Sequence, residues 1–277
     1  MPLLTDTSSP LWHDILIAGA PDTGKSASLL TFPRPLYVIS CPLEEGLGTL
    51  PRNLPDVKVF SYPLKLSDAV SWGDVIEQVR KDVVCILAGT HGPVKGGTLA
   101  LDGVHMLYDC WTYKTTGGVI GEVKALEAFK LYPAPNHPFF MDLLRWKQQA
   151  IERGMYYVVT AWMTPKKDQL NTANEKMRDV TFKEWPDLAG QAGKEITGKF
   201  SIKLKSFTEG EGRERIFWWK TTTDTDTGGI GIKGPVEIVS KIPLLLPQKW
   251  PSLAKYLVAP PAPDPVQSGP QATEKIR

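Results

Sequence analysis

The sequence predicts an α/β protein built as a three-layer sheet with a β-rich C-terminal portion. Short apolar runs bounded by Pro and Gly, typical of buried strands, occur at residues 14–19, 36–40 and 58–62. Segments with helical spacing of apolar residues alternate with further strands up to about residue 163. Beyond residue 200 the pattern changes to alternating strands. Strands that alternate with helices and then continue as strands alone favour a layered sheet covered by helices.

A helix with a marked start is expected between the third and fourth strands. Ser71 and Asp74 form a capping-box pattern that opens a helix at residues 71–81. The apolar run at residues 83–89 fits either a strand or a continuation of that helix, and periodicity does not distinguish the two. Residues 98–102, TLALD, predict the fourth strand.

The second half of the chain is expected to begin with a long helix and to end with strands. Residues 139–154 place apolar side chains on one helical face, and Gly154 is expected to end that helix. Residues 156–163, YYVVTAWM, are β-branched and aromatic, which is typical of a strand. Three more strands, forming an antiparallel edge or hairpin, are expected at residues 200–207, 215–221 and 237–243.

The composition is that of an ordinary globular protein. Of the 277 residues 42% are apolar, and the net charge is +2, so any basic surface must be local. No apolar stretch reaches the roughly 18 residues that a membrane helix needs, and the first residues lack a secretory pattern. Three cysteines without metal or disulfide spacing favour a reducing compartment. We therefore expect a cytoplasmic protein with no membrane partner.

The domain organisation is expected to be simple. No internal repeat is found, and residues 13–258 read as one domain that follows a loose lead-in at residues 1–12. Residues 259–277 are rich in Pro, Ser, Gln and Ala without an apolar period. Such a segment buries too little apolar surface to offset its ordering entropy, so a disordered tail is predicted.

The strongest motif is GAPDTGKS at residues 19–26, which matches G-x-x-x-x-G-K-[ST] in full. An apolar strand precedes it and the helix-compatible segment KSASLLTF follows. Backbone N–H groups of such a loop can surround phosphate oxygens, Lys25 can reach the β- and γ-phosphates, and the Ser26 hydroxyl can bind Mg²⁺. Gly19 and Gly24 would allow a close approach to phosphate. The predicted ligands are ATP and Mg²⁺, and the predicted nucleotide-binding residues are Gly19, Ala20, Pro21, Asp22, Thr23, Gly24, Lys25, Ser26 and Ala27.

Acidic residues follow two of the predicted strands. Asp102 ends TLALD, where a carboxylate emerges beside the phosphate-binding loop and can hold the metal together with Ser26. Glu44 and Glu45 follow the second strand and are candidates for the base that orients water, with Glu45 first. A solvated loop pair is the alternative for the two glutamates. The predicted catalytic residues are therefore Lys25, Glu45, Glu44 and Asp102.

The segments DILIAGAPDTGKS, RPLYVISCPLEEGLGTL, GGTLALDGVHML and YYVVTAWM together resemble the RecA-like AAA-type P-loop ATPases of bacteriophages. That group includes single-strand annealing recombinases. The resemblance covers about residues 13–255 and implies a RecA-like P-loop NTPase sheet with Glu45 as the catalytic glutamate. Family members usually have Ser after the strand-end Asp, where this chain has Gly103. Their polar sensor, frequently histidine, aligns with Trp162, and Thr160 is the expected substitute.

The resemblance also implies a homo-oligomer, a ring or filament with ATP at its subunit interfaces. A basic residue from a neighbouring subunit would then stabilise charge on the γ-phosphate. Candidates for this residue are Lys203, Lys205 and Lys220, although a solvated strand face explains any one of them as well.

A candidate contact surface for single-stranded DNA follows TLALD at residues 113–138. It combines basic and aromatic residues, which suit phosphates and bases respectively, but an ordinary surface insertion has the same composition. The residues concerned are Lys114, Lys124, Lys130, Tyr113, Phe129 and Tyr132. His105 and His137 have no partners at metal-ligand spacing and are expected to be structural. Trp218 and Trp219 are expected to combine packing with partial exposure.

The function favoured by these observations is Mg²⁺-dependent ATP hydrolysis in phage DNA recombination, replication or repair, in the cytoplasm of the host cell. Three alternatives stay open. A small-molecule P-loop kinase would normally carry an Arg-rich lid, which the β-rich end does not suggest. A packaging or helicase-loading motor is the second, and a non-enzymatic nucleotide-binding scaffold is the third.

Overall fold

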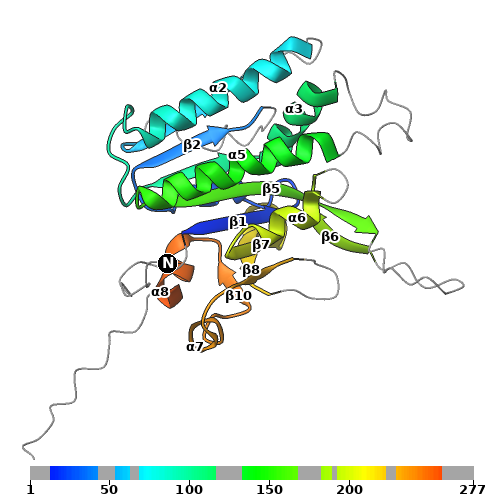
Figure 1. Ribbon diagram of the computed structural model, residues 1–277. Helices are drawn as coiled ribbons and strands as arrows, with labels where there is room; N and C mark the ends of the chain where they lie inside the picture. Colours follow the sequence, from blue (N-terminus) through cyan, green and yellow to red (C-terminus); the bar gives the residue numbers. More distant parts are fainter. Residues whose placement is uncertain are drawn as a thin grey trace, which may run out of the picture.

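The computed structural model describes residues 13–42, 54–62, 69–116, 133–167, 182–188, 192–222 and 229–257. Within these ranges the protein is an α/β fold with a mostly parallel mixed sheet of ten strands and seven helices (Figure 1). The strands are β1 (Asp14–Gly19), β2 (Leu36–Ser40), β3 (Val57–Ser61), β4 (Thr98–Asp102), β5 (Tyr156–Lys167), β6 (Phe182–Pro186), β7 (Ile202–Glu209), β8 (Ile216–Lys220), β9 (Gly231–Ile232) and β10 (Leu245–Pro247). The helices are α1 (Lys25–Leu29), α2 (Ala69–Leu87), α3 (Val104–Thr116), α5 (Pro133–Glu152), α6 (Ala192–Gly198), α7 (Val236–Val239) and α8 (Trp250–Leu257).

The strand order is β10-β8-β7-β1-β5-β4-β2-β3. The six strands from β7 to β3 in this order pair in parallel. Strands β8 and β10 continue the sheet in antiparallel fashion, while β6 pairs with the end of β5 and β9 pairs with β7. Parallel strands all point their carboxyl ends to one edge of the sheet, which is where α/β folds place their ligands.

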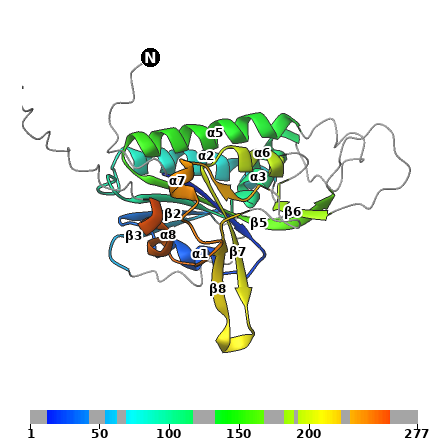
Figure 2. The same cartoon turned by 90° about the horizontal axis from the view of Figure 1, so that it is seen from below.

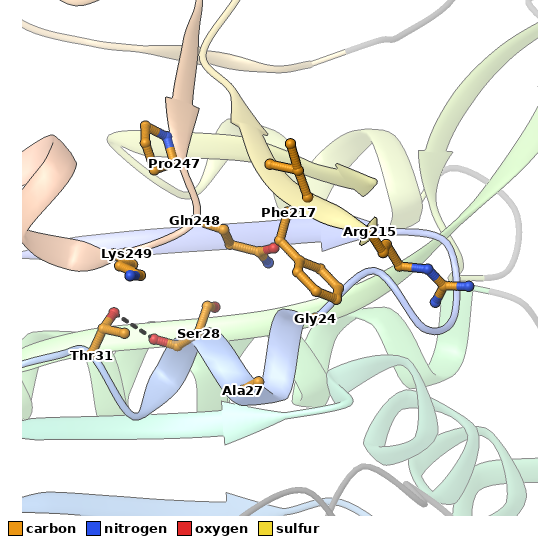
Figure 3. A pocket seen from close by; sticks show the side chains of 10 residues that line it. Gly24, Ala27, Ser28, Thr31, Arg215, Phe217, Pro247, Gln248 and Lys249 are labelled. Atoms are coloured by element: carbon orange, nitrogen blue, oxygen red, sulfur yellow. Dashed lines mark hydrogen bonds between the residues drawn. The ribbon is translucent and has the colours of Figure 1, made fainter. Parts of the chain in front are cut away.

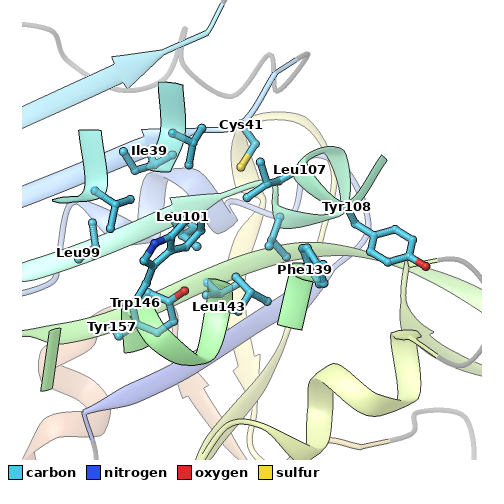
Figure 4. Packing of buried hydrophobic residues seen from close by; sticks show 14 of the residues in the cluster. Ile39, Cys41, Leu99, Leu101, Leu107, Tyr108, Phe139, Leu143, Trp146 and Tyr157 are labelled. Atoms are coloured by element: carbon cyan, nitrogen blue, oxygen red, sulfur yellow. The ribbon is translucent and has the colours of Figure 1, made fainter. Parts of the chain in front are cut away.

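Helices cover both faces of the sheet, as the predicted layered architecture requires. One apolar cluster lies between the sheet and helices α2, α3, α5 and α6, and includes Leu99, Leu101, Tyr157 and Trp146 (Figure 4). A second cluster joins the opposite face to α1 and α8 (Figures 1 and 2). Ala100 belongs to this second cluster, because successive side chains of a strand point to opposite faces.

Most predicted strands are confirmed, some with shifted ends. Strands β1, β2 and β4 have the predicted bounds, β3 lies one residue earlier than predicted, and β5 continues four residues further. The apolar run at residues 83–89 continues α2 as far as Leu87. Helix α2 begins at Ala69, so the capping box predicted at Ser71 is wrong: Ser71 lies inside the helix. Helix α5 starts at Pro133, six residues before the predicted position, and Gly154 follows its end with a φ of 70°.

The C-terminal prediction is correct in part. Strands β7 and β8 form the expected antiparallel hairpin, which extends from the sheet in Figure 2. Strand β7 also pairs in parallel with β1, so it is an interior strand and not an edge. The strand predicted at residues 237–243 is wrong, because Val236–Val239 form the short helix α7. Pro235 sets a φ of −56° before this helix, no residue of α7 is buried, and Leu245–Pro247 pair with β8 instead.

Three further expectations concern the chain as a whole. None of the helices in the described ranges is long and apolar enough to cross a membrane. Cys41, Cys85 and Cys110 are free cysteines. The predicted lead-in and the predicted tail lie outside the described residues.

Candidate nucleotide and metal site

The carboxyl ends of four parallel strands bring the predicted site residues to one edge of the sheet. Strand β1 ends at Gly19 and β4 ends at Asp102. Strand β5 lies between them and pairs Thr160 with Ile17 of β1. Ser40, the last residue of β2, lies in register with Asp102 on the other side of β4. The sheet therefore brings residues that are far apart in the chain to the loop at residues 19–26.

The loop at residues 19–26 has the predicted strand–turn–helix context. After β1 the chain turns through Asp22 and Gly24, which have φ values of 59° and 78°. Helix α1 begins at Lys25, and the Ser28 N–H donates to the Gly24 carbonyl oxygen (2.9 Å). The helix ends at Leu29, sooner than the segment KSASLLTF suggested. The positive φ of Gly24 explains why glycine stands directly before the helix.

The two loop glycines also allow close packing against the C-terminal hairpin. A Cβ atom on Gly19 would overlap the backbone carbonyl oxygen of Ser206 in β7. A Cβ atom on Gly24 would lie 2.6 Å from Cδ1 of Phe217 in β8. The Ser206 hydroxyl donates to the Thr23 carbonyl oxygen (2.8 Å), which fixes the loop to β7. The motif alone predicts room for phosphate at these glycines but not this contact with β7 and β8.

Lys25 lies over the loop and is buried. Its ammonium group donates to the Ala20 carbonyl oxygen (2.7 Å), which also accepts from the Thr23 hydroxyl (2.8 Å). Burial raises the pKa of Asp102 and the positive charge of Lys25 opposes that rise, whereas burial lowers the pKa of His105 and Lys25 adds to that fall. The field of Lys25 therefore reaches the end of β4 and the start of α3. A buried cation within the loop is suited to binding phosphate.

Asp102 is 1% exposed and is held by β5. The Thr160 hydroxyl donates to Oδ1 of Asp102 (2.6 Å) and accepts from the Gly103 N–H (2.8 Å). Oδ2 of Asp102 is buried and has no hydrogen-bond partner among the described residues. Burial raises the pKa of this carboxyl, and the hydrogen bond from Thr160, the nearby hydroxyl of Ser26 and the charge of Lys25 oppose the rise. An unpartnered carboxylate oxygen close to Ser26 fits a metal ion or its bound water.

Thr160, expected as a substitute sensor, donates a hydrogen bond to the acid at the end of β4. Trp162, at the position that the resemblance assigns to a sensor, packs its ring against His105 with centroids 4.6 Å apart. Burial, with a contribution from Lys25, lowers the pKa of His105 to about 3, so the imidazole is neutral. The structural role expected for His105 is consistent with this packing.

Ser40 lies beside the candidate site, although no sequence motif includes it. Its hydroxyl is buried and has no hydrogen-bond partner within the described ranges. It lies at the end of β2 opposite Asp102, whose carbonyl oxygen accepts from the Cys41 N–H (2.9 Å). The available signal was weak: Ser40 is the polar residue that ends the apolar run LYVIS, shortly before Glu44 and Glu45. A hydroxyl here can bind a water molecule of the metal.

The described residues could supply only some of the ligands of a Mg²⁺ ion. Among them no group of three or more His, Cys, Asp or Glu side chains could hold a metal ion. Ser26 and Asp102 would supply two oxygen ligands or contacts to bound water, and phosphate and water would supply the rest, as is usual for Mg²⁺. Glu44 and Glu45 lie outside the described residues.

The expected trans-acting lysines are partly engaged within the protein. Lys205 forms an ion pair with Glu184 of β6 (2.5 Å). Burial and the charge of Lys233 lower the pKa of Lys203. Lys220 lies between Lys205 and Leu245 in the register of the antiparallel strands. None of these contacts tests whether one of the three lysines reaches the γ-phosphate bound to a neighbouring subunit.

The expected DNA-contacting segment is described only at its two ends. Tyr113 stacks on Trp72 of α2 with ring centroids 4.8 Å apart, and Lys114 pairs with Glu77. Both side chains thus stabilise the packing of α3 on α2. The other basic and aromatic candidates, Lys124, Phe129, Lys130 and Tyr132, lie outside the described ranges. His137 is an exposed residue of α5.

Comparison of the chain with protein-family models and with curated proteins finds no match. The function is therefore inferred from the residues of the site and from the resemblance of the sequence segments quoted above.

Proposed function

We propose that the protein is a Mg²⁺-dependent ATPase of the RecA-like P-loop type that acts on DNA. One observation carries this proposal. The loop that ends in Lys25 and Ser26 lies beside a buried aspartate, Asp102, whose Oδ2 has no partner within the described ranges. A phosphate-binding loop needs an acid at this place to hold the metal, and a purely structural aspartate would normally have both oxygens satisfied.

The chain's own residues divide the chemistry between them. Backbone N–H groups of the loop and the Lys25 ammonium would bind the β- and γ-phosphates and stabilise charge on them. The Ser26 hydroxyl and Asp102 would hold Mg²⁺, whose contribution is to neutralise charge on the phosphate oxygens. Thr160 keeps the Asp102 carboxylate oriented. Glu45, or Glu44 in its place, would accept a proton from the attacking water.

The arrangement of the strands supports the RecA-like assignment. Strand β5, to which the resemblance assigns the sensor, lies between the strand of the loop and the strand of the acid. Beyond β5 the described chain continues as strands β6 to β10 with three short helices. This β-rich end supports an ATPase over a small-molecule kinase, as the sequence suggested. Action in phage recombination, replication or repair, as an oligomer on single-stranded DNA, follows from the resemblance.

Steady-state ATP hydrolysis by the purified protein, with and without long single-stranded DNA, tests the proposal. We expect hydrolysis that requires Mg²⁺, increases with DNA and disappears in Lys25→Ala. Hydrolysis that depends on Lys25 but not on DNA would leave the ATPase and refute the action on DNA. Absence of any Lys25-dependent nucleotide binding or hydrolysis would refute the ATPase. Glu45→Gln should bind ATP without hydrolysing it, and normal turnover in that variant would exclude Glu45 as the base.

A further inference from the structure

A cavity with a volume of about 480 Å³ opens beside the loop at residues 19–26. Its floor is one face of α1 and the turn after it, formed by Gly24, Ala27, Ser28 and Thr31, which follow one another at helical spacing. Its opposite wall comes from β8 and from the segment that joins β10 to α8 (Figure 3). The phosphate-binding end of α1 therefore leads directly into a cavity whose other side is formed by a distant part of the chain.

A buried hydrogen-bond acceptor lines this cavity. Gln248 is 7% exposed, and its Oε1 atom has no hydrogen-bond partner within the described residues. Its Nε2 atom lies 2.5 Å from the Ser206 hydroxyl, which itself donates to the Thr23 carbonyl oxygen. A hydroxyl has a single hydrogen to donate, so Ser206 must accept from the amide NH₂ of Gln248. This chain of hydrogen bonds fixes the amide and leaves Oε1 as the acceptor without a donor.

An aromatic ring lies next to this acceptor. Phe217 is 39% exposed, and its ring points toward Gly24 in Figure 3. A Cβ atom on Gly24 would lie 2.6 Å from Cδ1 of Phe217 and 3.1 Å from Oε1 of Gln248, so both groups meet over the same glycine. Because Oε1 is buried, access to it from the cavity requires the Phe217 ring to turn aside and to present its face to the cavity. A planar ligand stacked on that face would bring its edge to Oε1.

We propose that this cavity binds the adenine base of the nucleotide and that Gln248 selects it through the exocyclic amino group. The inference rests on the proposed ATPase, since the phosphates would lie at Lys25 and the base further along α1. Adenine carries an NH₂ donor at position 6 that satisfies Oε1. Guanine and hypoxanthine carry a carbonyl oxygen there, and two acceptors facing each other leave both unsatisfied. The hydrogen bonds from Gln248 through Ser206 to Thr23 also connect the base site to the phosphate-binding loop.

Equilibrium binding measured by calorimetry in Mg²⁺ tests the inference with three probes: ATP, ITP and inorganic tripolyphosphate. ITP differs from ATP in carrying oxygen in place of the amino group, and tripolyphosphate reports on the loop without a base. The wild-type protein should bind ATP about tenfold more tightly than ITP. Gln248→Met should bind ATP and ITP equally while its affinity for tripolyphosphate is unchanged. The matched control Gln78→Met, at an exposed glutamine of α2, should keep the tenfold preference.

A second variant keeps the test decisive if Gln248→Met folds poorly, which thermal unfolding would reveal. Phe217→Leu retains an apolar side chain without the aromatic face, and should weaken ATP and ITP alike by about tenfold while sparing tripolyphosphate. Equal binding of ATP and ITP to the wild-type protein, or full ATP affinity in Phe217→Leu, would overturn the inference. If Lys25→Ala bound tripolyphosphate as well as the wild-type protein did, the proposed ATPase itself would fail.

Discussion

The two parts of the sheet that meet at β1 differ in burial and in what they would contribute to the site. Every residue of β1, β2 and β4 is buried. In β7 burial alternates along the strand, and in β8 and β10 most residues are exposed or intermediate. The buried parallel part carries the loop and Asp102, whereas the half-exposed part carries Ser206, Phe217 and the segment that leads to Gln248. Phosphate and metal chemistry would thus belong to one part of the sheet and base recognition to the other.

Contacts across β1 connect the two parts. Gly19 has no Cβ and so allows the Ser206 carbonyl of β7 to approach, and Ser206 donates to Thr23 of the loop. The loop is thus fixed by its contacts with β7 on one side. On its other side, next to Asp102 at the end of β4, it would bind phosphate and Mg²⁺. Variants in the buried parallel part should therefore change ATP hydrolysis. Variants in the half-exposed part, or at its contact with β1, should change stability or base preference.

The largest effect is expected for Lys25→Ala, in the buried parallel part. Removal of the ammonium that would stabilise charge on the phosphates should lower kcat for ATP hydrolysis by roughly 1,000-fold. Lys241→Ala, at an exposed lysine near α7, is the control and should hydrolyse ATP at the wild-type rate. Steady-state kinetics at saturating Mg²⁺ gives both values. Comparable loss in both variants would show that Lys25 has no special role.

Asp102→Asn should separate binding from hydrolysis. The variant keeps the side-chain shape and the hydrogen bond from Thr160, but it loses the negative charge that would hold Mg²⁺. We expect kcat to fall by roughly 100-fold while the Kd for ATP changes far less. Single-turnover hydrolysis and calorimetry measure the two quantities. An unchanged kcat would remove Asp102 from the metal site.

Gly19→Ala tests the close contact between β1 and β7 through its effect on the free energy of unfolding. The new Cβ would overlap a backbone oxygen of β7, which cannot move without shifting the strand. The free energy of unfolding should fall by about 2 kcal/mol. Gly198→Ala is the matched control, because nothing lies within 4 Å of a Cβ at that position, and its free energy of unfolding should change by less than about 0.5 kcal/mol. Urea denaturation distinguishes them, and equal stability of the two variants would contradict the contact.

Thr160→Val should give the smallest effect, a change in pH dependence. The Thr160 hydrogen bond favours the charged form of Asp102 and lowers its pKa, so its removal should raise that pKa further. The carboxylate then becomes protonated at a higher pH, and the acidic limb of the turnover profile should move to higher pH. Turnover at the optimum should fall by about tenfold. Thr160→Ser keeps the hydroxyl and should keep the wild-type profile; a downward shift of the limb in Thr160→Val would contradict the assignment.

The buried parallel part of the sheet could be predicted from the sequence alone, whereas the place of the half-exposed part could not. Strands β1, β2 and β4 are uninterrupted apolar runs, and the loop and Asp102 belong to local motifs, so both could be found by inspection. The place of β7 beside β1 could not, because alternation in SIKLKSF is equally typical of an edge strand and the pairing joins segments about 190 residues apart. Phe217, Gln248 and Ser40 belong to no motif, and they join the site only through strand order. The segment EIVSKIP at residues 237–243 suggested a strand, but Pro235 and the lack of burial favour α7.

A crystal structure with Mg²⁺ and a non-hydrolysable ATP analogue tests the central claim most directly, because it shows both parts of the site at once. The account predicts phosphates between Gly19 and Lys25, the metal between Ser26 and Asp102, and the base against Phe217 with its amino group at Gln248. A nucleotide whose base lies away from the β8 wall would contradict the division between the two parts. A structure with no nucleotide at the loop under saturating conditions would contradict the ATPase itself.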